Sequence, residues 1–415
     1  MLGGSSNPCT FAYNILMADQ TTNAIRSTRF EVGCLFTPAA VLQDACVITG
    51  GDGTILYADS EAAAPVLDDA VRITVPELWL APGFLDIHTH GAIGIGFGVG
   101  ENLAADLERY AQWALQSGVT GFLCSVVAET SQALNDILAA YVPIFESGTS
   151  GARALGLHLE GPFLNPQKKG VFFPEWLREP SLVEANSYLD TAGKWIRQVS
   201  LAPELNGSLE LACALRKAGI TVALAHSAAD YETARMALMG DFTHVTHTFN
   251  CMDDFNHRAP GVVGAILGSD EVTAELIGDV NLVNPGAMRV LLRCLGPERV
   301  VVVTDASTGA GLPDGYYELF GQPMIIRDGR SFLEDGRLAG SAALMNGCVR
   351  TMHNQVGASV QDAIRMVTAN PARAIGLHGR YGMIAAGRPA DLVLMDDQFQ
   401  IRMTMVGGRI LYQNL

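Results

Sequence analysis

Histidines and a glutamate that could hold a metal ion stand at the ends of several apolar runs. His88 and His90 form an HxH pair, and alternate residues of an extended segment point the same way, so the two could share one ion. Glu160 ends an apolar run before a Gly-Pro break, and His226 and His247 end two further runs. Imidazole combined with carboxylate suits zinc or a related divalent ion. We therefore predict a metal site made of these five residues. The alternatives are a general base or a loop cap for Glu160, and two surface histidines at a strand end for His88 and His90.

Two other histidines and one aspartate lie close to these positions in the sequence. His158 lies one layer deeper on its strand, and His244 faces away from His247, so we predict structural roles for both. Asp305 ends an apolar run and precedes a glycine-rich loop that extends to residue 315. A carboxylate beside a metal site can act as general base and general acid, with a turn or N-cap aspartate as the alternative.

The scarcity of lysine bears on how two metal ions could be bridged. Some barrel hydrolases use a carboxylated lysine at a strand end for this purpose. None of the four lysines of this chain stands at an expected strand end: Lys168, Lys169, Lys194 and Lys217. Glu160 would therefore have to fill the bridging role.

The elements that must position these residues follow from the pattern between residues 81 and 378, where short apolar runs alternate with helix-length amphipathic segments. The expected strands are 83–87, 121–127, 154–159, 196–201, 222–225, 242–246 and 300–304. The expected helices include 103–117, 131–145, 209–218 and 231–239. Seven or eight such units favour an α/β fold with a TIM-like (β/α)8 barrel, whose active site lies at the C-terminal ends of the strands.

Both ends of the chain carry β-prone segments that differ from this rhythm. In residues 1–80 these are 45–49, 53–57 and 71–75, with a hairpin turn expected at 50–53. In residues 379–415 they are 382–384, 390–395, 401–406 and 409–412. We therefore expect the two ends to meet in one small β-sandwich domain, with the barrel at 81–378.

The composition excludes several classes of protein and partner. Apolar residues make up 49% and charged residues 17% of the chain, so a large core is expected rather than disorder. A net charge of −16 disfavours nucleic acid and anionic membranes as partners, and no apolar run is long enough for a membrane span. The eight cysteines form no CxxC pair, and no secretory leader is recognisable, so we expect a cytoplasmic protein with a small-molecule substrate.

Eight short motifs occur in order along the chain and together resemble a known family. They are HLEGPF (158–163), LAPE (201–204), AHS (225–227), THTFNCM (246–252), HRAPG (257–261), TDA (304–306), AGS (339–341) and NPAR (370–373). Over residues 81–396 the chain resembles the N-acetylglucosamine-6-phosphate deacetylase family of the amidohydrolase superfamily. The resemblance implies hydrolysis of the N-acetyl amide of an amino sugar to give glucosamine-6-phosphate and acetate.

The resemblance also implies a metal content and a role for each ligand. Glu160, His226 and His247 would hold the principal divalent ion. His88 and His90 would hold a second ion in members that are binuclear. We expect zinc, with iron, manganese or cobalt as alternatives that the same ligands accept.

Further roles carry over to residues that would act on the substrate. Asp305 would take a proton from the attacking water and pass it to the leaving amine. Asn250 and the backbone of Cys251 would contact the sugar, and Arg258 would meet the phosphate across the interface of a homodimer. The pocket would be shaped by the strip Leu338, Ala339 and Gly340.

Two positions depart from the family pattern and leave the substrate open. Phe172 stands where the family has a histidine that polarises the substrate carbonyl, and Leu282 where it has a histidine near the sugar phosphate. Losing an oxyanion donor can cost roughly 100- to 1000-fold in rate, although a metal ion could take over that role. The alternative to the family substrate is therefore a less polar or unphosphorylated N-acyl amine, with Phe172 and Leu282 lining an apolar subsite. A remoter alternative is an inactive barrel with a binding role, which the retained Asp305 and metal ligands disfavour.

Overall fold

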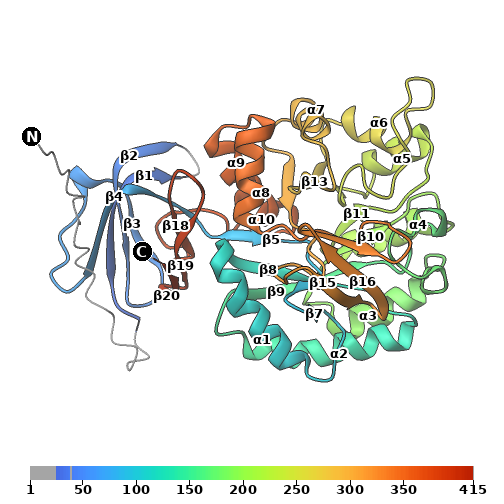
Figure 1. Ribbon diagram of the computed structural model, residues 1–415, viewed down its shortest axis with the longest axis horizontal. Coiled ribbons are helices and arrows are strands. Elements are labelled where there is room, and N and C mark those ends of the chain that lie inside the picture. The colour runs from blue at the N-terminus through green and yellow to red at the C-terminus, as the bar shows by residue number, and fades with distance from the viewer. Residues whose placement is uncertain (1–24, 38–39, 415) are drawn as a thin grey trace, which may run out of the picture.

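A computed structural model describes residues 25–37 and 40–414, and it shows a barrel-like unit beside a smaller sheet (Figure 1). The larger unit is built on eight parallel strands in the order β14-β13-β12-β11-β10-β9-β8-β5. Their bounds are β5 (Phe84–Asp86), β8 (Val119–Val126), β9 (Arg153–Glu160), β10 (Ile196–Leu201), β11 (Thr221–Leu224), β12 (His244–Val245), β13 (Thr273–Ile277) and β14 (Val300–Val303). Strands β8 and β14 are buried along their whole length, as expected for parallel strands that are covered on both faces.

The two outer strands of this sheet, β5 and β14, are joined just beyond their C-terminal ends. The backbone N–H of Asp305 donates to the carbonyl of His88 at 2.9 Å, and that of His90 donates to the carbonyl of Ala306 at 2.8 Å. A parallel bridge between Thr89 and Ala306 continues this pairing. The sheet thereby curves into a barrel, and the predicted α/β barrel is confirmed.

Helices follow most of the barrel strands and cover them from outside (Figure 1). Their bounds are α1 (Leu103–Ala114), α2 (Ser131–Ser147), α3 (Leu182–Ala192), α4 (Ser208–Lys217), α5 (Tyr231–Met239), α6 (Gly261–Leu267), α7 (Pro285–Leu295), α8 (Met345–Thr351), α9 (Val360–Met366) and α10 (Ala369–Ala374). Side-chain oxygens of Asn102, Thr130 and Asp230 accept from backbone N–H groups in the first turns of α1, α2 and α5, which favours helix initiation there. Across the described part of the chain, no helix has the length and apolar character to cross a membrane.

The smaller unit is one mixed sheet of seven strands in the order β20-β19-β18-β4-β1-β2-β3. The bounds are β1 (Thr28–Phe36), β2 (Val41–Thr49), β3 (Ile55–Ser60), β4 (Val71–Pro82), β18 (Leu392–Met395), β19 (Ile401–Val406) and β20 (Arg409–Gln413). Strand β4 pairs parallel with β1 and antiparallel with β18, so both chain ends share the sheet. One apolar cluster, which draws on β1, β2, β4, β18 and β19, packs within it. The expectation that the two chain ends build one small β unit is confirmed.

Several elements of the fold, strand β1 among them, were not expected from the sequence, and two of these features lie at the site. Strand β13 was missed because Glu275 interrupts its apolar run. The segment after Asp305 forms a three-stranded antiparallel sheet, β15 (Gly315–Leu319), β16 (Gln322–Arg327) and β17 (Arg330–Leu333), where only a loop was anticipated through residue 315. Both features contribute residues to the site described next.

Candidate metal centre and active site

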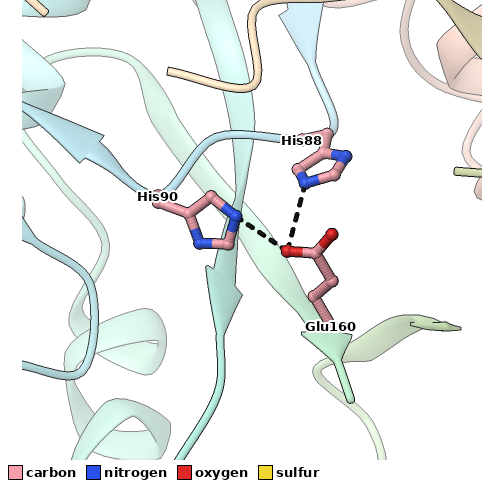
Figure 2. A group of neighbouring side chains, drawn as sticks. All are labelled: His88, His90 and Glu160. Carbon is pink, nitrogen blue, oxygen red and sulfur yellow. Dashed lines mark ion pairs between the residues drawn. The ribbon is translucent and has the colours of Figure 1, made fainter. Parts of the chain in front are cut away.

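Four histidines surround the carboxylate of Glu160 at the C-terminal ends of the barrel strands. His88 and His90, just beyond β5, both point at one oxygen of Glu160 at the end of β9 (Figure 2). Their Nε2 atoms lie 3.5 and 2.8 Å from Oε2. The other oxygen, Oε1, lies 3.2 Å from Nε2 of His226 and 3.0 Å from Nε2 of His247. Glu160 is therefore shared by two triads, each of which could hold a metal ion.

The backbone turns sharply where three of the site residues follow their strands. His226, His247 and Asp305 have φ values of 42°, 30° and 48°, in the left-handed region that residues other than glycine rarely adopt. They come directly after or within two residues of the ends of β11, β12 and β14. Such a conformation costs about 1–3 kcal/mol and persists only where the surrounding structure imposes it, which is common at functional sites.

The ring nitrogens at this centre fit a bound divalent cation. His88 is buried, yet its Nε2 atom has no hydrogen-bond partner within residues 25–37 and 40–414. The Nε2 atoms of His226 and His247 lie only 3.0 Å apart while both face Glu160. Lone pairs of several imidazoles that converge on a carboxylate are the donor set that zinc and related metals prefer.

The electrostatic environment of these triads favours positive charge. Burial acts to lower the pKa of His88, but Asp305, Glu275 and Glu160 outweigh it and raise that pKa well above its ordinary value. Burial acts to raise the pKa of Glu160, but His88 and hydrogen bonds with His226 and His247 hold that pKa well below its usual range. Surroundings that stabilise a charged imidazolium also stabilise a metal cation at the same place.

A second layer of contacts fixes two of the histidine rings. The Nδ1–H of His88 donates to Oε2 of Glu275 at 2.7 Å, and the Nδ1–H of His226 donates to the carbonyl of Lys168 at 2.6 Å. Because Nδ1 carries the proton in each case, Nε2 presents its lone pair to the centre. The sequence analysis missed Glu275; a charged residue inside an otherwise apolar core strand was the available signal, since such residues are seldom buried unless paired.

The two histidines with predicted structural roles lie inside the barrel below the centre. His158 bonds to the hydroxyl groups of Ser125 and Ser200 at 2.9 and 2.8 Å. Burial lowers the pKa of His158 well below its ordinary value, so this ring is neutral. His244 contacts Thr273 at 2.6 Å and Glu275 at 3.2 Å. In the part of the chain that the structure describes, neither histidine belongs to a group that could hold a metal.

Asp305 lies at the edge of the triads, where it can reach a reacting water. Its Oδ1 atom is 3.4 Å from Nε2 of His88 and 3.7 Å from Nε2 of His90. Its side chain is 14% exposed, and it lines a cavity of about 170 Å³ that opens beside the triads. A carboxylate in this position can exchange protons with a water and with a substrate.

Most residues predicted to bind the substrate line that cavity, but two do not. The predicted residues that line it are Phe172, Asn250, Cys251, Leu282, Leu338 and Gly340. Ala339 is completely buried and does not line the cavity. Arg258 is exposed and lies outside the lining. Within the described part of the chain, no lysine or arginine contributes to the cavity wall.

Phe320 is a cavity residue that the sequence analysis did not identify. It forms the turn between β15 and β16 with a φ of 51°, and its ring centroid lies 5.7 Å from that of His90 and 6.2 Å from that of Phe172. The side chain of Gln322 holds the turn in place by donating to the carbonyl of Val171 at 2.8 Å. The available signal was a Phe-Gly pair between two alternating β-prone runs.

Comparison with known proteins places the whole barrel in one family. Residues 79–411 match the Amidohydrolase family. An N-acetylglucosamine-6-phosphate deacetylase from Bos taurus is 36% identical over 348 residues, covering 80% of this chain and 83% of the relative. An N-acetylgalactosamine-6-phosphate deacetylase from Escherichia coli O157:H7 is 33% identical over 331 residues, covering 80% and 87%.

Solved structures give the same result. The N-acetylglucosamine-6-phosphate deacetylase from Pasteurella multocida superposes with a TM-score of 0.86 at 29% identity, over 94% of this chain and 100% of the other. A Mycobacterium smegmatis mutant enzyme in complex with N-acetyl-D-glucosamine-6-phosphate also gives 0.86, at 27% identity, over 94% and 100%. The similarity therefore extends over the small sheet as well as the barrel.

Proposed function

The chain belongs to the N-acetylhexosamine-6-phosphate deacetylases of the amidohydrolase family, and from this premise we propose that it deacetylates N-acetylglucosamine-6-phosphate. The products would be glucosamine-6-phosphate and acetate. The observation that carries the proposal is the pair of triads that share Glu160, with Asp305 beside them at the edge of a cavity. A retained metal centre with an adjacent carboxylate also argues against an inactive barrel.

Each residue of the centre has a place in this reaction. Glu160, His226 and His247 would hold one divalent ion, zinc by preference, and His88 and His90 would share Glu160 in holding a second. When bound, such an ion polarises the scissile carbonyl and lowers the pKa of water.

The remaining steps fall to Asp305 and to the cavity wall. Asp305 takes a proton from the attacking water and then delivers it to the nitrogen of the leaving amine. Asn250 and the backbone of Cys251 orient the sugar. Arg258 reaches the phosphate of a neighbouring active site in a homodimer.

The direct test is amine release from three substrates by the metal-loaded enzyme: N-acetylglucosamine-6-phosphate, N-acetylgalactosamine-6-phosphate and unphosphorylated N-acetylglucosamine. We expect kcat/KM for the first to exceed that for the unphosphorylated sugar by about 100-fold or more, since an unpaired phosphate site penalises the wrong substrate heavily. A preference for N-acetylgalactosamine-6-phosphate would support deacetylation but identify galactosamine as the sugar. Turnover of none of the three would reject the proposal.

A less polar N-acyl amine is the second candidate, and the cavity wall favours it. Phe172 and Leu282, the two positions at which the family resemblance led us to expect histidines, line the cavity, and Phe320 and Leu319 add further apolar surface. The nearest anion-binding side chain would have to come from outside the cavity. An enzyme that hydrolyses N-acyl amines with apolar substituents, but none of the three sugars, would establish this alternative.

Restoring histidine at position 172 or 282 separates the two candidates. We expect Phe172→His to raise kcat/KM for N-acetylglucosamine-6-phosphate by on the order of 10-fold, because a donor would again face the substrate carbonyl. Leu282→His should lower KM for the phosphorylated sugar more than for the unphosphorylated one. Phe173→His is the matched control, because Phe173 is adjacent but does not line the cavity. Unchanged kinetics in both test variants would show that these positions do not set specificity.

A further inference from the structure

We propose that Glu275 is the positioning residue that enables the triad of His88, His90 and Glu160 to hold a second metal ion. The inference rests on the proposed metal-dependent function and adds to it a residue outside the ligand set. Glu275 lies on β13, inside the barrel, and is completely buried. A buried carboxylate is costly unless its oxygens are satisfied, so its contacts indicate what it does.

Both oxygens of Glu275 are occupied by hydrogen-bond donors. Oε2 accepts from Nδ1 of His88 at 2.7 Å and from the backbone N–H of His247 at 3.1 Å. Oε1 accepts from Nε2 of Gln198 at 2.8 Å and contacts Nε2 of His244 at 3.2 Å. Donors on both oxygens stabilise the ionised form of the side chain, so Glu275 is a carboxylate.

The hydrogen bond with Glu275 distinguishes His88 from His90, the other histidine of the same triad. The Nδ1 atom of His90 is buried and has no hydrogen-bond partner among the described residues, and the same is true of Nδ1 of His247 in the other triad. Each triad therefore contains one ring held by an acceptor, His88 by Glu275 and His226 by the carbonyl of Lys168. A carboxylate is the stronger acceptor, and it increases the basicity of the ligating nitrogen.

Charge compensation supports the same conclusion. Two divalent ions would place four positive charges in a buried site, against which the ligand triads supply only the carboxylate of Glu160. Asp305 and Glu275 are the additional carboxylates in contact with His88. Among the described contacts, Glu275 meets the other triad only through the backbone of His247, which does not orient that ring. The effect of removing its charge should therefore fall mainly on the ion held by His88 and His90.

The test is equilibrium dialysis of the full-length protein against graded free Co²⁺, with bound metal counted by elemental analysis and no substrate present. The wild-type protein should bind two ions per chain. In Glu275→Gln we expect the weaker binding step to weaken by about 10- to 100-fold, the usual effect of losing such a partner, while the tighter step changes by less than about 3-fold. Gln198→Leu is the matched control, because it removes one buried donor to Oε1 and leaves the contact with His88; it should retain both ions.

Several outcomes would overturn the proposal. Unchanged binding in Glu275→Gln would show that the carboxylate is not needed, and an equal loss at both steps would show a general structural role. A wild-type protein that binds one ion would remove the second site altogether. If Glu275→Gln does not fold, Glu275→Asp is measured instead. This variant keeps the charge but is one methylene shorter, and its weaker binding step should again weaken more than the tighter one. Because metal binding is measured without substrate, these results are independent of whether the deacetylase activity is found.

Discussion

Replacing Asp305 by asparagine is expected to lower kcat by about 100- to 10,000-fold, the contribution usual for a general acid and base. The bound metal should remain at the wild-type level. Asparagine keeps the size and most hydrogen bonds of aspartate, but it cannot accept a proton from the attacking water at neutral pH. The two triads do not include Asp305, so their ligands stay in place. The measurement is steady-state kinetics together with elemental analysis of the same preparation.

Asp314→Asn is the matched control for this variant. Asp314 is exposed on the segment that follows Asp305 and accepts only from the backbone of Asp328 among the described contacts. A surface substitution of this kind should change neither activity nor metal content appreciably. Wild-type turnover in Asp305→Asn would eliminate Asp305 as the base. Loss of metal in that variant would instead identify Asp305 as a ligand.

The second large effect is expected from Glu160→Ala, which should abolish metal binding at both triads at once. One side chain supplies the carboxylate oxygen of each triad, at 2.8 Å from His90 and 3.0 Å from His247. Its removal leaves two pairs of imidazoles without a shared anion. We expect metal affinity to fall by at least about 100-fold, beyond the effect of losing a second-layer partner, and activity to fall with it.

Two comparisons make this result interpretable. Glu179→Ala, at an exposed position beyond the same ends of the strands, should retain both ions and full activity. Thermal unfolding in the presence of a chelator should show that Glu160→Ala is folded, so that loss of metal reflects the missing ligand. A Glu160→Ala protein that still holds two ions would refute the shared-carboxylate arrangement. One that holds a single ion would show that the two triads do not depend equally on Glu160.

The two departures from the family pattern, Phe172 and Leu282, have a common structural consequence. Phe172 is almost fully buried and packs with Leu164 and Leu177, while Phe320 approaches it from the β15–β16 turn. Aromatic side chains therefore cover the part of the cavity wall beside His90 and His226. The substrate comparison proposed above determines whether this wall tolerates a sugar phosphate or selects another acyl amine.

The sequence by itself determined the barrel and the residues at its catalytic end. Six of the seven expected strands overlap barrel strands by three residues or more, and β12, reduced to His244–Val245, lies inside the seventh. Apolar runs and helical periodicity are local properties, so neighbouring residues are sufficient to specify them. Because the C-terminal ends of barrel strands meet at one face, polar residues at those ends could be grouped before any distance was known.

Only the tertiary structure decided how these groups contact one another. Glu275 contacts His88, which lies 187 positions away in the sequence. The contacts of Glu160 with His88 at 3.5 Å and with His226 at 3.2 Å depend on strand register and barrel closure. The turn that brings Phe320 to His90 belongs to a sheet inserted after the last barrel strand. Such contacts join segments that are distant in the chain, and their geometry depends on the packing of the whole barrel, which residue types and spacing do not record.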